Sequence, residues 1–236
     1  MHFAVTIFAL VLLCAVAPAT AQDAVFESVK AAKDIKLSTD PSLPFWHAAH
    51  PIYAEKGPYG DSREHYRTEI RSRWTEKNLY VLFVCPYQQL NLNPSPNTTA
   101  ETFRLWDWDV AEMFIGSDFQ NIRRYKEFEV SPQQEWIDLD IDLAKPHHED
   151  GWTWNSGFIV SARIDAAAKV WYAAMRIPLS SLQSQPPAAG QTFRVNFFRS
   201  QGPEPNRVQV VWQPTMSNTF HTPEKFGLLR LMDAAR

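Results

Sequence analysis

Apolar residues recur at every second position over much of the chain from Tyr66 onward, and this period constrains the fold more than any other feature of the sequence. A period of two puts alternate side chains on opposite faces of a β-strand, so that one face is buried and the other is polar. Residues 79–84 are apolar at every position, which predicts a central strand buried on both faces. The alternation recurs in seven further segments: 66–74, 128–130, 137–143, 158–164, 170–174, 193–197 and 208–212.

Roughly ten such strands, joined by polar turns and without the spacing of βαβ units, predict an all-β fold. We expect an antiparallel β-sandwich of two sheets, jelly-roll-like, in one domain. The long irregular segments between the strands are rich in Pro or Asn, and long loops on a rigid scaffold are where function is usually found. Those segments are 38–63, 88–102, 145–156, 184–191 and 201–207.

The first 21 residues predict export. Residues 1–21 contain no Asp, Glu, Lys or Arg, and an apolar run at 3–16 is followed at 19–21 by Ala-Thr-Ala, the small-x-small pattern that precedes cleavage. The run is too short for a comfortable membrane span, and no later segment predicts one. We therefore expect a signal peptide at 1–21, a single domain at 22–236, and a destination in the periplasm or outside the cell.

Composition narrows the partners and the chemistry. The formal net charge is −3, so the chain lacks the basic surface that binds phosphate backbones, and we expect no nucleic-acid partner. After signal-peptide removal Cys85 alone remains, and its apolar neighbours predict a buried, unreactive thiol. Nine tryptophans are more than a core of this size requires. We assign Trp46, Trp74 and Trp171 to packing, which leaves others for stacking on a ligand.

The densest group of informative residues spans 103–114, where a loop with Trp106 and Trp108 leads into an apolar strand. The same stretch carries the carboxylates of Asp107 and Glu112. Carbohydrate sites need aromatic faces to stack on sugar rings, and carboxylates or amides to bond the hydroxyls. The segment therefore predicts a sugar-binding surface, and the alternative is that its two indoles are ordinary core residues.

Five segments, in order along the chain, resemble the family 9 carbohydrate-binding modules, which are secreted sandwiches found attached to xylanases and also alone. Residues 106–115 (WDWDVAEMFI) resemble the family's W-x-x-D-x-V-E-x-F-I/L. The resemblance covers nearly all of 22–236, and its strength lies in the ordered set. The other four segments are 39–46 (TDPSLPFW, like D-G-x-x-D-x-x-W), 74–81 (WTEKNLYV, like W-D-x-x-x-L-Y-V), 125–132 (YKEFEVSP, like Y-x-E-F-x-x-x-P) and 223–231 (PEKFGLLRL, like P-x-x-F-G-x-L-x-L/F).

The resemblance implies a site in which two aromatic side chains clamp the terminal ring of a polysaccharide or oligosaccharide. The first aromatic matches Trp106, and the second matches Phe220, where the family pattern has Trp. The family's ligand-bonding Glu matches Glu112, and polar residues before the second clamp map near Asn218. Two further tryptophans are expected to support or extend the platform: Trp108 and Trp212.

One strand departs from the family pattern. Where the pattern offers Arg and Asn to the sugar, this chain has Glu127 and Glu129, which makes the surface acidic, and we expect a changed ligand or a bound cation. Some family members hold structural calcium through carboxylates and carbonyls, so calcium is the cofactor that the resemblance implies. Residues 138–142, with Asp at alternate positions, lack the Gly and distal Glu of a calcium loop, and we interpret them as the solvent face of a strand.

We therefore predict an exported, non-catalytic protein that binds the end of a glycan and serves polysaccharide breakdown. A glycoside hydrolase is the alternative, because residues 107–112 are similar to the E-x-D-x-x-E of laminarinase-like enzymes, with Asp107 and Glu112 as the carboxylate pair. The strand alternation points those two carboxylates to opposite faces, which disfavours that chemistry. The weaker alternative is a haem-binding or structural relative with ligands such as Met113 or His221, although no pattern singles out a pair.

Overall fold

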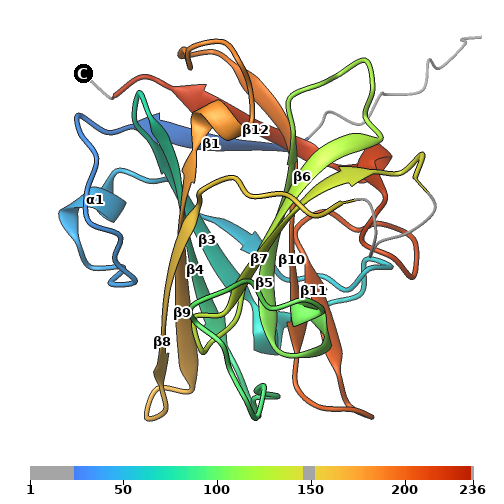
Figure 1. Cartoon of the computed structure of the whole chain (residues 1–236). Helices are drawn as coiled ribbons and strands as arrows, with labels where there is room; N and C mark the ends of the chain where they lie inside the picture. Colours follow the sequence, from blue (N-terminus) through green and yellow to red (C-terminus); the bar gives the residue numbers. More distant parts are fainter. Residues whose placement is uncertain (1–23, 146–151, 235–236) are drawn as a thin grey trace, which may run out of the picture.

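The computed structural model describes residues 24–145 and 152–234, which are almost entirely β-structure (Figure 1). The predicted signal peptide at 1–21 lies outside the described residues. Besides the strands, the described residues form one short helix, α1 (Pro44–His47), and four 3₁₀ turns. The strands are β1 (Val25–Lys30), β2 (Ile52–Ala54), β3 (Thr68–Trp74), β4 (Asn78–Pro86), β5 (Val110–Gly116), β6 (Arg124–Val130), β7 (Trp136–Asp142), β8 (Ile159–Asp165), β9 (Val170–Pro178), β10 (Thr192–Gln201), β11 (Val208–Val211) and β12 (Gly227–Met232).

All twelve strands belong to one hydrogen-bonded sheet, in the order β7-β6-β5-β10-β12-β1-β3-β4-β9-β8, with β11 beside β10 and β2 beside β3. Figure 1 shows that the sheet turns back on itself. The half that contains β5, β6, β7 and β10 faces the half that contains β3, β4, β8 and β9, and β1 and β12 cross between them. The predicted central strand at 79–84 lies within β4, between β3 and β9.

The all-β prediction is confirmed, but the arrangement differs from two separate antiparallel sheets of about ten strands. The sheet is mixed, because β1 runs parallel to both β12 and β3, and it curls into a nearly barrel-like shape (Figure 1). Val29 and Lys30 pair with β3, while residues 25–29 pair with β12. Alternation reports which face of a strand is buried and not which strands are neighbours, and β1 (VFESVK) does not itself alternate.

The main hydrophobic core lies between the two halves of the sheet and includes Phe26, Trp74, Phe83 and Phe197. Cys85 is fully buried there, which confirms the predicted burial. Burial raises the pKa of its thiol to about 12, the direction expected of an unreactive thiol. Trp74 and Trp171 are in this core, and Trp46 is in a smaller cluster beside α1. The assignment of these three tryptophans to packing is therefore confirmed.

A second hydrophobic cluster covers the opposite, outer face of β5, β6, β7 and β10. Phe114 of β5, Tyr125 of β6, Ile137 of β7 and Phe198 of β10 all belong to it. Loop residues such as Leu105 pack onto the same cluster, so these strands are buried on both faces. Loops therefore cover the outer face of this half of the sheet, and the candidate site described below lies between these loops and the strands.

The acidic face of β7 is not the solvent face predicted from its alternation. Asp138 is buried, and its Oδ2 accepts hydrogen bonds from the backbone nitrogen and the hydroxyl of Ser156, at 2.9 and 2.5 Å. Asp140 is half-buried and pairs with Lys126 at 2.7 Å. The prediction is wrong for Asp138 because residues 152–158 run beside β7 and bring Ser156 over this position.

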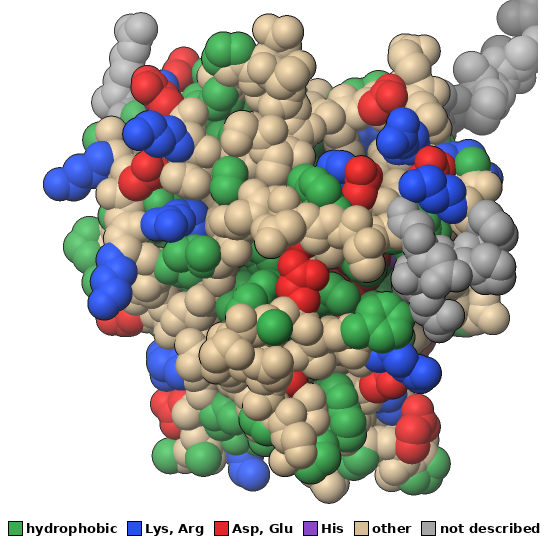
Figure 2. Space-filling model, viewed as in Figure 1, with side chains coloured by type: hydrophobic (Ala, Val, Ile, Leu, Met, Phe, Trp, Pro, Cys, Tyr) green, Lys and Arg blue, Asp and Glu red, His purple; other side chains and the backbone are tan. Residues whose placement is uncertain are grey.

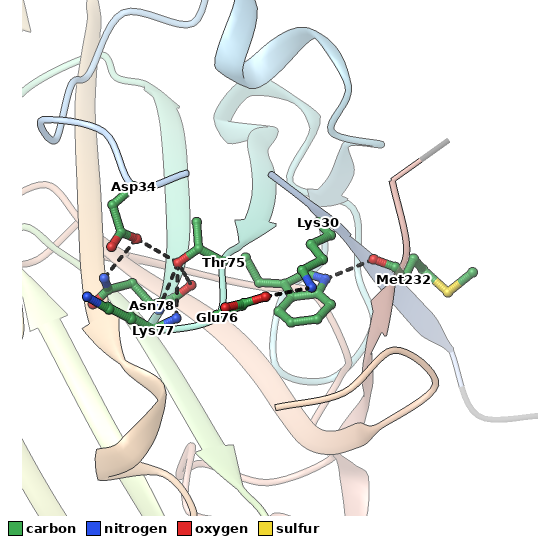
Figure 3. Close-up of polar contacts among 8 residues, drawn as sticks. Lys30, Asp34, Thr75, Glu76, Lys77, Asn78 and Met232 are labelled. Atoms are coloured by element: carbon green, nitrogen blue, oxygen red, sulfur yellow. Dashed lines mark hydrogen bonds and ion pairs between the residues drawn. The ribbon is translucent and has the colours of Figure 1, made fainter. Parts of the chain in front are cut away.

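Polar contacts fix the turn between β3 and β4 to the rest of the fold (Figure 3). Asp34 accepts hydrogen bonds from Thr75 at 2.6 Å and from Asn78 at 2.9 Å. The indole of Trp74 donates to the carbonyl of Met232 at 2.9 Å, which joins the end of β3 to the end of β12. The segment after β1, the β3–β4 turn and the last strand are therefore held together at one end of the molecule.

The face shown in Figure 2 carries Lys, Arg, Asp and Glu side chains interspersed, without a large patch of one sign. This mixture agrees with the net charge of −3. Among the residues that the structure describes, no helix is long and apolar enough to span a bilayer.

Candidate functional site

A cavity of about 230 Å³ lies over the outer face of β5 and β6, where three loops converge. It is somewhat smaller than the roughly 300–1,000 Å³ of typical small-molecule sites. Five residues that the sequence singled out line it together: Trp106, Glu112, Glu127, Asn218 and Phe220. Six more line it that the sequence did not single out for sugar binding: Phe114, Ser200, Arg207, Gln209, Thr219 and His221.

Trp106 stands in a 3₁₀ turn (Leu105–Asp107) just before β5. Leu105 beside it is fully buried in the outer cluster and anchors the turn. Arg207, from the loop between β10 and β11, donates to the carbonyls of Trp106 and Trp108, at 2.7 and 2.6 Å. A loop distant in sequence therefore holds the backbone on both sides of Asp107, which fixes where the Trp106 indole meets the cavity.

Asp109 makes a second connection between the same two loops. Its Oδ1 accepts a hydrogen bond from the backbone nitrogen of Gly202 at 2.6 Å, and its own nitrogen donates to the carbonyl of Asn91 at 2.8 Å. Burial raises the pKa of Asp109 to about 6, although the Gly202 hydrogen bond and the nearby Arg199 and Arg207 act in the opposite direction. Hydrogen bonds thus hold the loop that carries Trp106 to the loop between β10 and β11.

Phe220 forms the other aromatic wall, from the loop before β12. Its ring stacks on Phe198 of β10, with centroids 4.3 Å apart and an interplanar angle of 12°. The neighbouring His221 stacks on Phe114, at 5.2 Å and 27°, and its Nδ1 is hydrogen-bonded to the hydroxyl of Tyr125 at 2.7 Å. The loop is therefore held on the sheet by two aromatic stacks.

The carboxylates of Glu112 and Glu127 line the cavity, and Glu129 lies beside them. Glu112 of β5 is directly opposite Glu129 of β6, and Glu127 is two residues away on the same face of β6. One oxygen from each lies within 4.8 Å of one oxygen from each of the others. Burial raises the pKa of all three carboxyls, that of Glu127 to about 7, and the neighbouring carboxylates raise those of Glu112 and Glu129 further.

The structure does not bring every predicted site residue into this cavity. Trp212 is buried in the main core, where it contacts Phe26 and Phe197. Trp108 is half-buried and contributes its carbonyl to the Arg207 contact, but it is not among the described residues that line the cavity. Trp212 therefore belongs to the core, and Trp108 contributes to the wall of the cavity through its backbone carbonyl.

The structure also shows where the residues of the glycoside hydrolase and haem-binding alternatives lie. Asp107 is exposed and is bound by Arg104, whose Nε and Nη2 lie 2.8 and 3.3 Å from its two oxygens. The carboxylate of Glu112 is grouped with those of Glu127 and Glu129, and Asp107 does not belong to this group. Met113, considered as a haem ligand, is fully buried in the main core.

A larger hollow of about 350 Å³ lies at the other end of β5, lined by residues such as Gly116, Asp118 and Ser181. It contains Tyr125 and Asp140, but no tryptophan is among the described residues that line it. The smaller cavity combines two aromatic walls with buried carboxylates and an amide, which is the set of groups that a sugar requires. The smaller cavity is therefore the better candidate site.

Sequence reasoning missed Arg207 and His221 as parts of the site. Arg207 is in an irregular segment, and only the fold shows that its guanidinium reaches the carbonyls on either side of Asp107. His221 directly follows Phe220 in the chain, so the clamp assignment could have included it. Neither residue belongs to an alternating strand, and so no periodicity marks them.

Comparison with known proteins supports the family resemblance. The carbohydrate family 9 binding domain-like family matches residues 44–234. An extracellular protein of Arthroderma benhamiae is 24% identical over 174 residues, which are 68% of this chain and 77% of that protein.

Solved structures with the same fold include carbohydrate-binding proteins. A protein from Bacteroides uniformis described as carbohydrate-binding is 14% identical, with a TM-score of 0.68 over 89% of this chain and 100% of that one. A family 9 carbohydrate-binding module from Caldicellulosiruptor kristjanssonii, in complex with cellotriose, is 15% identical, with a TM-score of 0.64 over 90% and 95% of the two chains. The glucose complex of a family 9 module from the same organism has a TM-score of 0.62 at 13% identity, over 90% and 97%. At these identities the likeness concerns the fold.

Proposed function

The chain belongs to the carbohydrate family 9 binding domain-like family, and from this premise we propose that it is a non-catalytic protein that binds the end of a glycan in the cavity between Trp106 and Phe220. The observation that carries the proposal is the convergence of both aromatics with Glu112 and Asn218 on one cavity, although they come from separate segments of the chain. The family resemblance predicts each of the four for a sugar site.

The two aromatic side chains would hold opposite sides of one sugar ring. Trp106 is half-buried and has an edge contact with Phe103, at 5.5 Å and 81°, while Phe220 is backed by Phe198. An aromatic ring that is already supported loses little freedom when a ligand stacks on it, so more of the stacking energy is available for binding. Pairs of aromatic side chains gain about 0.5–1.5 kcal/mol beyond the burial of their area, and we expect a sugar stacked on each ring to gain an amount of the same order.

Polar groups around the cavity would bond the hydroxyls of the ring. Asn218 offers both an amide donor and an acceptor, Glu112 offers carboxylate oxygens, and Gln209 and Thr219 lie on the same lining. Because each hydroxyl exchanges water for protein at small net gain, these contacts select an orientation more than they add affinity. We therefore expect weak binding that depends chiefly on the aromatic walls.

The ligand class that we propose is a glucan or related polysaccharide. Family 9 modules of the same fold are complexed with cellotriose and with glucose, and a cavity of about 230 Å³ suits one terminal ring better than a long internal stretch of chain. Export to the periplasm or medium, where polysaccharides are broken down, is part of the proposal. It is supported by the apolar run at residues 3–16 and by the relative that is named an extracellular protein.

A glycan array with the 22–236 protein tests this function. We expect signals on glucan-type oligosaccharides for the unchanged protein and loss of those signals for Trp106→Ala. Phe119→Ala is a matched control, since Phe119 is an aromatic residue, 46% exposed, outside the cavity lining, and it should keep the signals. Silence of the unchanged protein, or equal signals from all three, would contradict glycan binding through Trp106.

The hydrolase alternative has its own test. Because Asp107 is engaged by Arg104 and Glu112 is grouped with two other buried carboxylates, we expect no release of reducing ends from β-glucans. Release that disappears in Glu112→Gln would instead identify a glycoside hydrolase.

A further inference from the structure

Glu112, Glu127 and Glu129 form a group at the floor of the cavity that the binding of a neutral sugar does not explain. Their side chains are 3%, 2% and 0% exposed. Glu112 and Glu129 face each other across β5 and β6, and like charges directly opposite on neighbouring strands repel. A sugar hydroxyl could use one such carboxylate, but three within 4.8 Å need a further reason.

The group lacks the partners that buried carboxylates normally have. No donor from another described residue reaches the two oxygens of Glu129, Oε1 of Glu112 or Oε2 of Glu127, all of which are buried. The carboxyls of Glu127 and Glu129 have only each other within hydrogen-bonding reach. None of the three forms an ion pair with a residue that the structure describes. Arg207 is close enough to influence Glu112, but its guanidinium donates to backbone carbonyls.

A neighbouring buried carboxylate shows the contrast. Asp138 of β7 is also buried, yet Ser156 donates two hydrogen bonds to it. Both bonds go to Oδ2, so an amide and a hydroxyl donor reach Asp138 although its Oδ1 has no partner, whereas no such donor reaches Glu129. Charged groups that are buried without compensation cost several kcal/mol each, so the Glu112–Glu127–Glu129 group requires either protons or a bound cation.

The spacing of the oxygens suits one ion. Two ligands of the same ion are at most twice the metal–oxygen distance apart, which for calcium at 2.3–2.6 Å is about 4.6–5.2 Å. One oxygen from each of the three carboxylates lies within 4.8 Å of the others, so the three are close enough to share one such ion. Carboxylate oxygens are hard ligands, which favour Ca²⁺ over the softer transition metals.

We propose that Glu112, Glu127 and Glu129 together bind one Ca²⁺ at the floor of the cavity. Calcium takes six to eight oxygen ligands, so carboxylates from one side leave positions for water or ligand oxygens. Because Glu112 and Glu127 line the cavity, those positions face the space between Trp106 and Phe220. If the proposed function holds, sugar hydroxyls would complete the coordination; the ion site itself does not depend on that function.

Titration calorimetry with CaCl₂ on the chelator-treated 22–236 protein at neutral pH tests the site without any sugar. We expect one Ca²⁺ per chain, and at least about tenfold weaker binding for Glu129→Gln, since even second-shell changes cost metal sites that much. The matched control is Asp138→Asn, which alters a buried carboxylate on the neighbouring strand and should leave the affinity unchanged. No calcium binding by the unchanged protein, or equal binding by Glu129→Gln, would overturn the proposal.

Glu129→Gln removes one of three like charges, so we expect it to fold, and thermal unfolding in chelator checks this. Should it fail to fold, anomalous diffraction from crystals of the unchanged protein soaked in Mn²⁺ decides the matter. Density between the three carboxylates supports the site, and density elsewhere or none overturns it. Since neither measurement contains a glycan, failure of the ion site and failure of glycan binding are separate results.

Discussion

At the scale of single residues, the cavity departs most from the expected clamp at Phe220. The ring has the place of a second stacking residue but offers less area than an indole. Its stack on Phe198 covers one face and leaves the other toward the cavity. Phe220 therefore limits the affinity of the proposed site more than Trp106 does.

Phe220→Trp should tighten glycan binding. A larger ring at this position adds stacking area, and a gain of about 0.4–1 kcal/mol corresponds to roughly 2- to 5-fold in Kd. Calorimetry with an oligosaccharide found on the array measures it, with Phe119→Trp as the control outside the cavity. An unchanged or weaker affinity would mean that Phe220 does not stack on the ligand.

Asp109 should give the protein an unusual dependence of stability on pH. Its pKa is raised by burial to about 6 from 3.8, so the folded state binds a proton more tightly than the unfolded state does. The contribution of this group to the free energy of unfolding therefore increases as the pH falls from 7 towards 4, by about 3 kcal/mol at most.

Denaturant unfolding of Asp109→Asn at several pH values checks this effect. The variant should lose that part of the pH dependence, because Asn carries no charge in either state. Glu76→Gln, at a side chain that is 83% exposed, should keep the original profile. Identical profiles for the unchanged protein and Asp109→Asn would contradict the argument.

At the scale of elements, the contact of β1 with β12 joins the two halves of the sheet, and it depends on a glycine. A Cβ at Gly227 would lie 2.6 Å from Cη2 of Trp212 and 2.7 Å from the carbonyl oxygen of Ala24. The first of these belongs to a buried ring and the second to the backbone, so neither can move away cheaply. Only glycine lets β12 approach both.

Gly227→Ala should lower the free energy of unfolding by about 1–3 kcal/mol, as overpacking of a core does. Thermal or denaturant unfolding measures the loss. Gly116→Ala is the comparison, because its added Cβ would meet the side chain of Tyr125 at 3.2 Å, a milder contact. Equal losses in the two variants would show that close packing at Gly227 is not what β12 requires.

The sequence predicts a strand where its pattern of apolar residues shows which faces are buried. It does not predict a strand whose place depends on the neighbours with which it pairs. β4 and β9 have buried apolar runs or alternation, and the sequence identifies them. β1 is short and mixes Glu27, Ser28 and Lys30 with apolar residues, so nothing local indicates that it pairs in parallel with two strands. The alternation of β7 likewise predicts that Asp138 faces solvent. Residues 152–158 cover it, and their place beside β7 depends on the folded chain.

The site was predictable to a similar extent. Trp106, Glu112 and Phe220 were named from a family resemblance, and they line one cavity. Alternation could not assign Trp212 to the core rather than to the platform, because aromatic residues suit both. The role of Arg207 depends on a contact between two loops about 100 positions apart, which no local pattern contains.

At the scale of the whole molecule, one continuous sheet and one main core connect both halves. β12 and β1 are hydrogen-bonded to each other and to a strand of each half, and the main core takes side chains from both halves. We therefore expect a single cooperative unfolding transition, with tryptophan fluorescence and far-UV circular dichroism changing together. Two separated transitions would show that the halves are independent.

The whole fold also explains why the proposed glycan site lies over the packed outer face of the sheet. The outer face of β5, β6 and β10 is covered by packed aromatics, while the walls of the cavity come from loops held by Arg207, Asp109 and the Phe220 stack. The scaffold fixes where the walls stand, and the loop residues determine what they bind. The proposed function is thus a property of loops positioned by the sheet.

The most direct test of the central claim is a crystal structure of the 22–236 protein with an oligosaccharide that the array identifies. The account predicts one terminal sugar ring between Trp106 and Phe220, with hydroxyls within hydrogen-bond distance of Asn218. A glycan bound elsewhere on the protein, or in this cavity without contact to either aromatic ring, would contradict it.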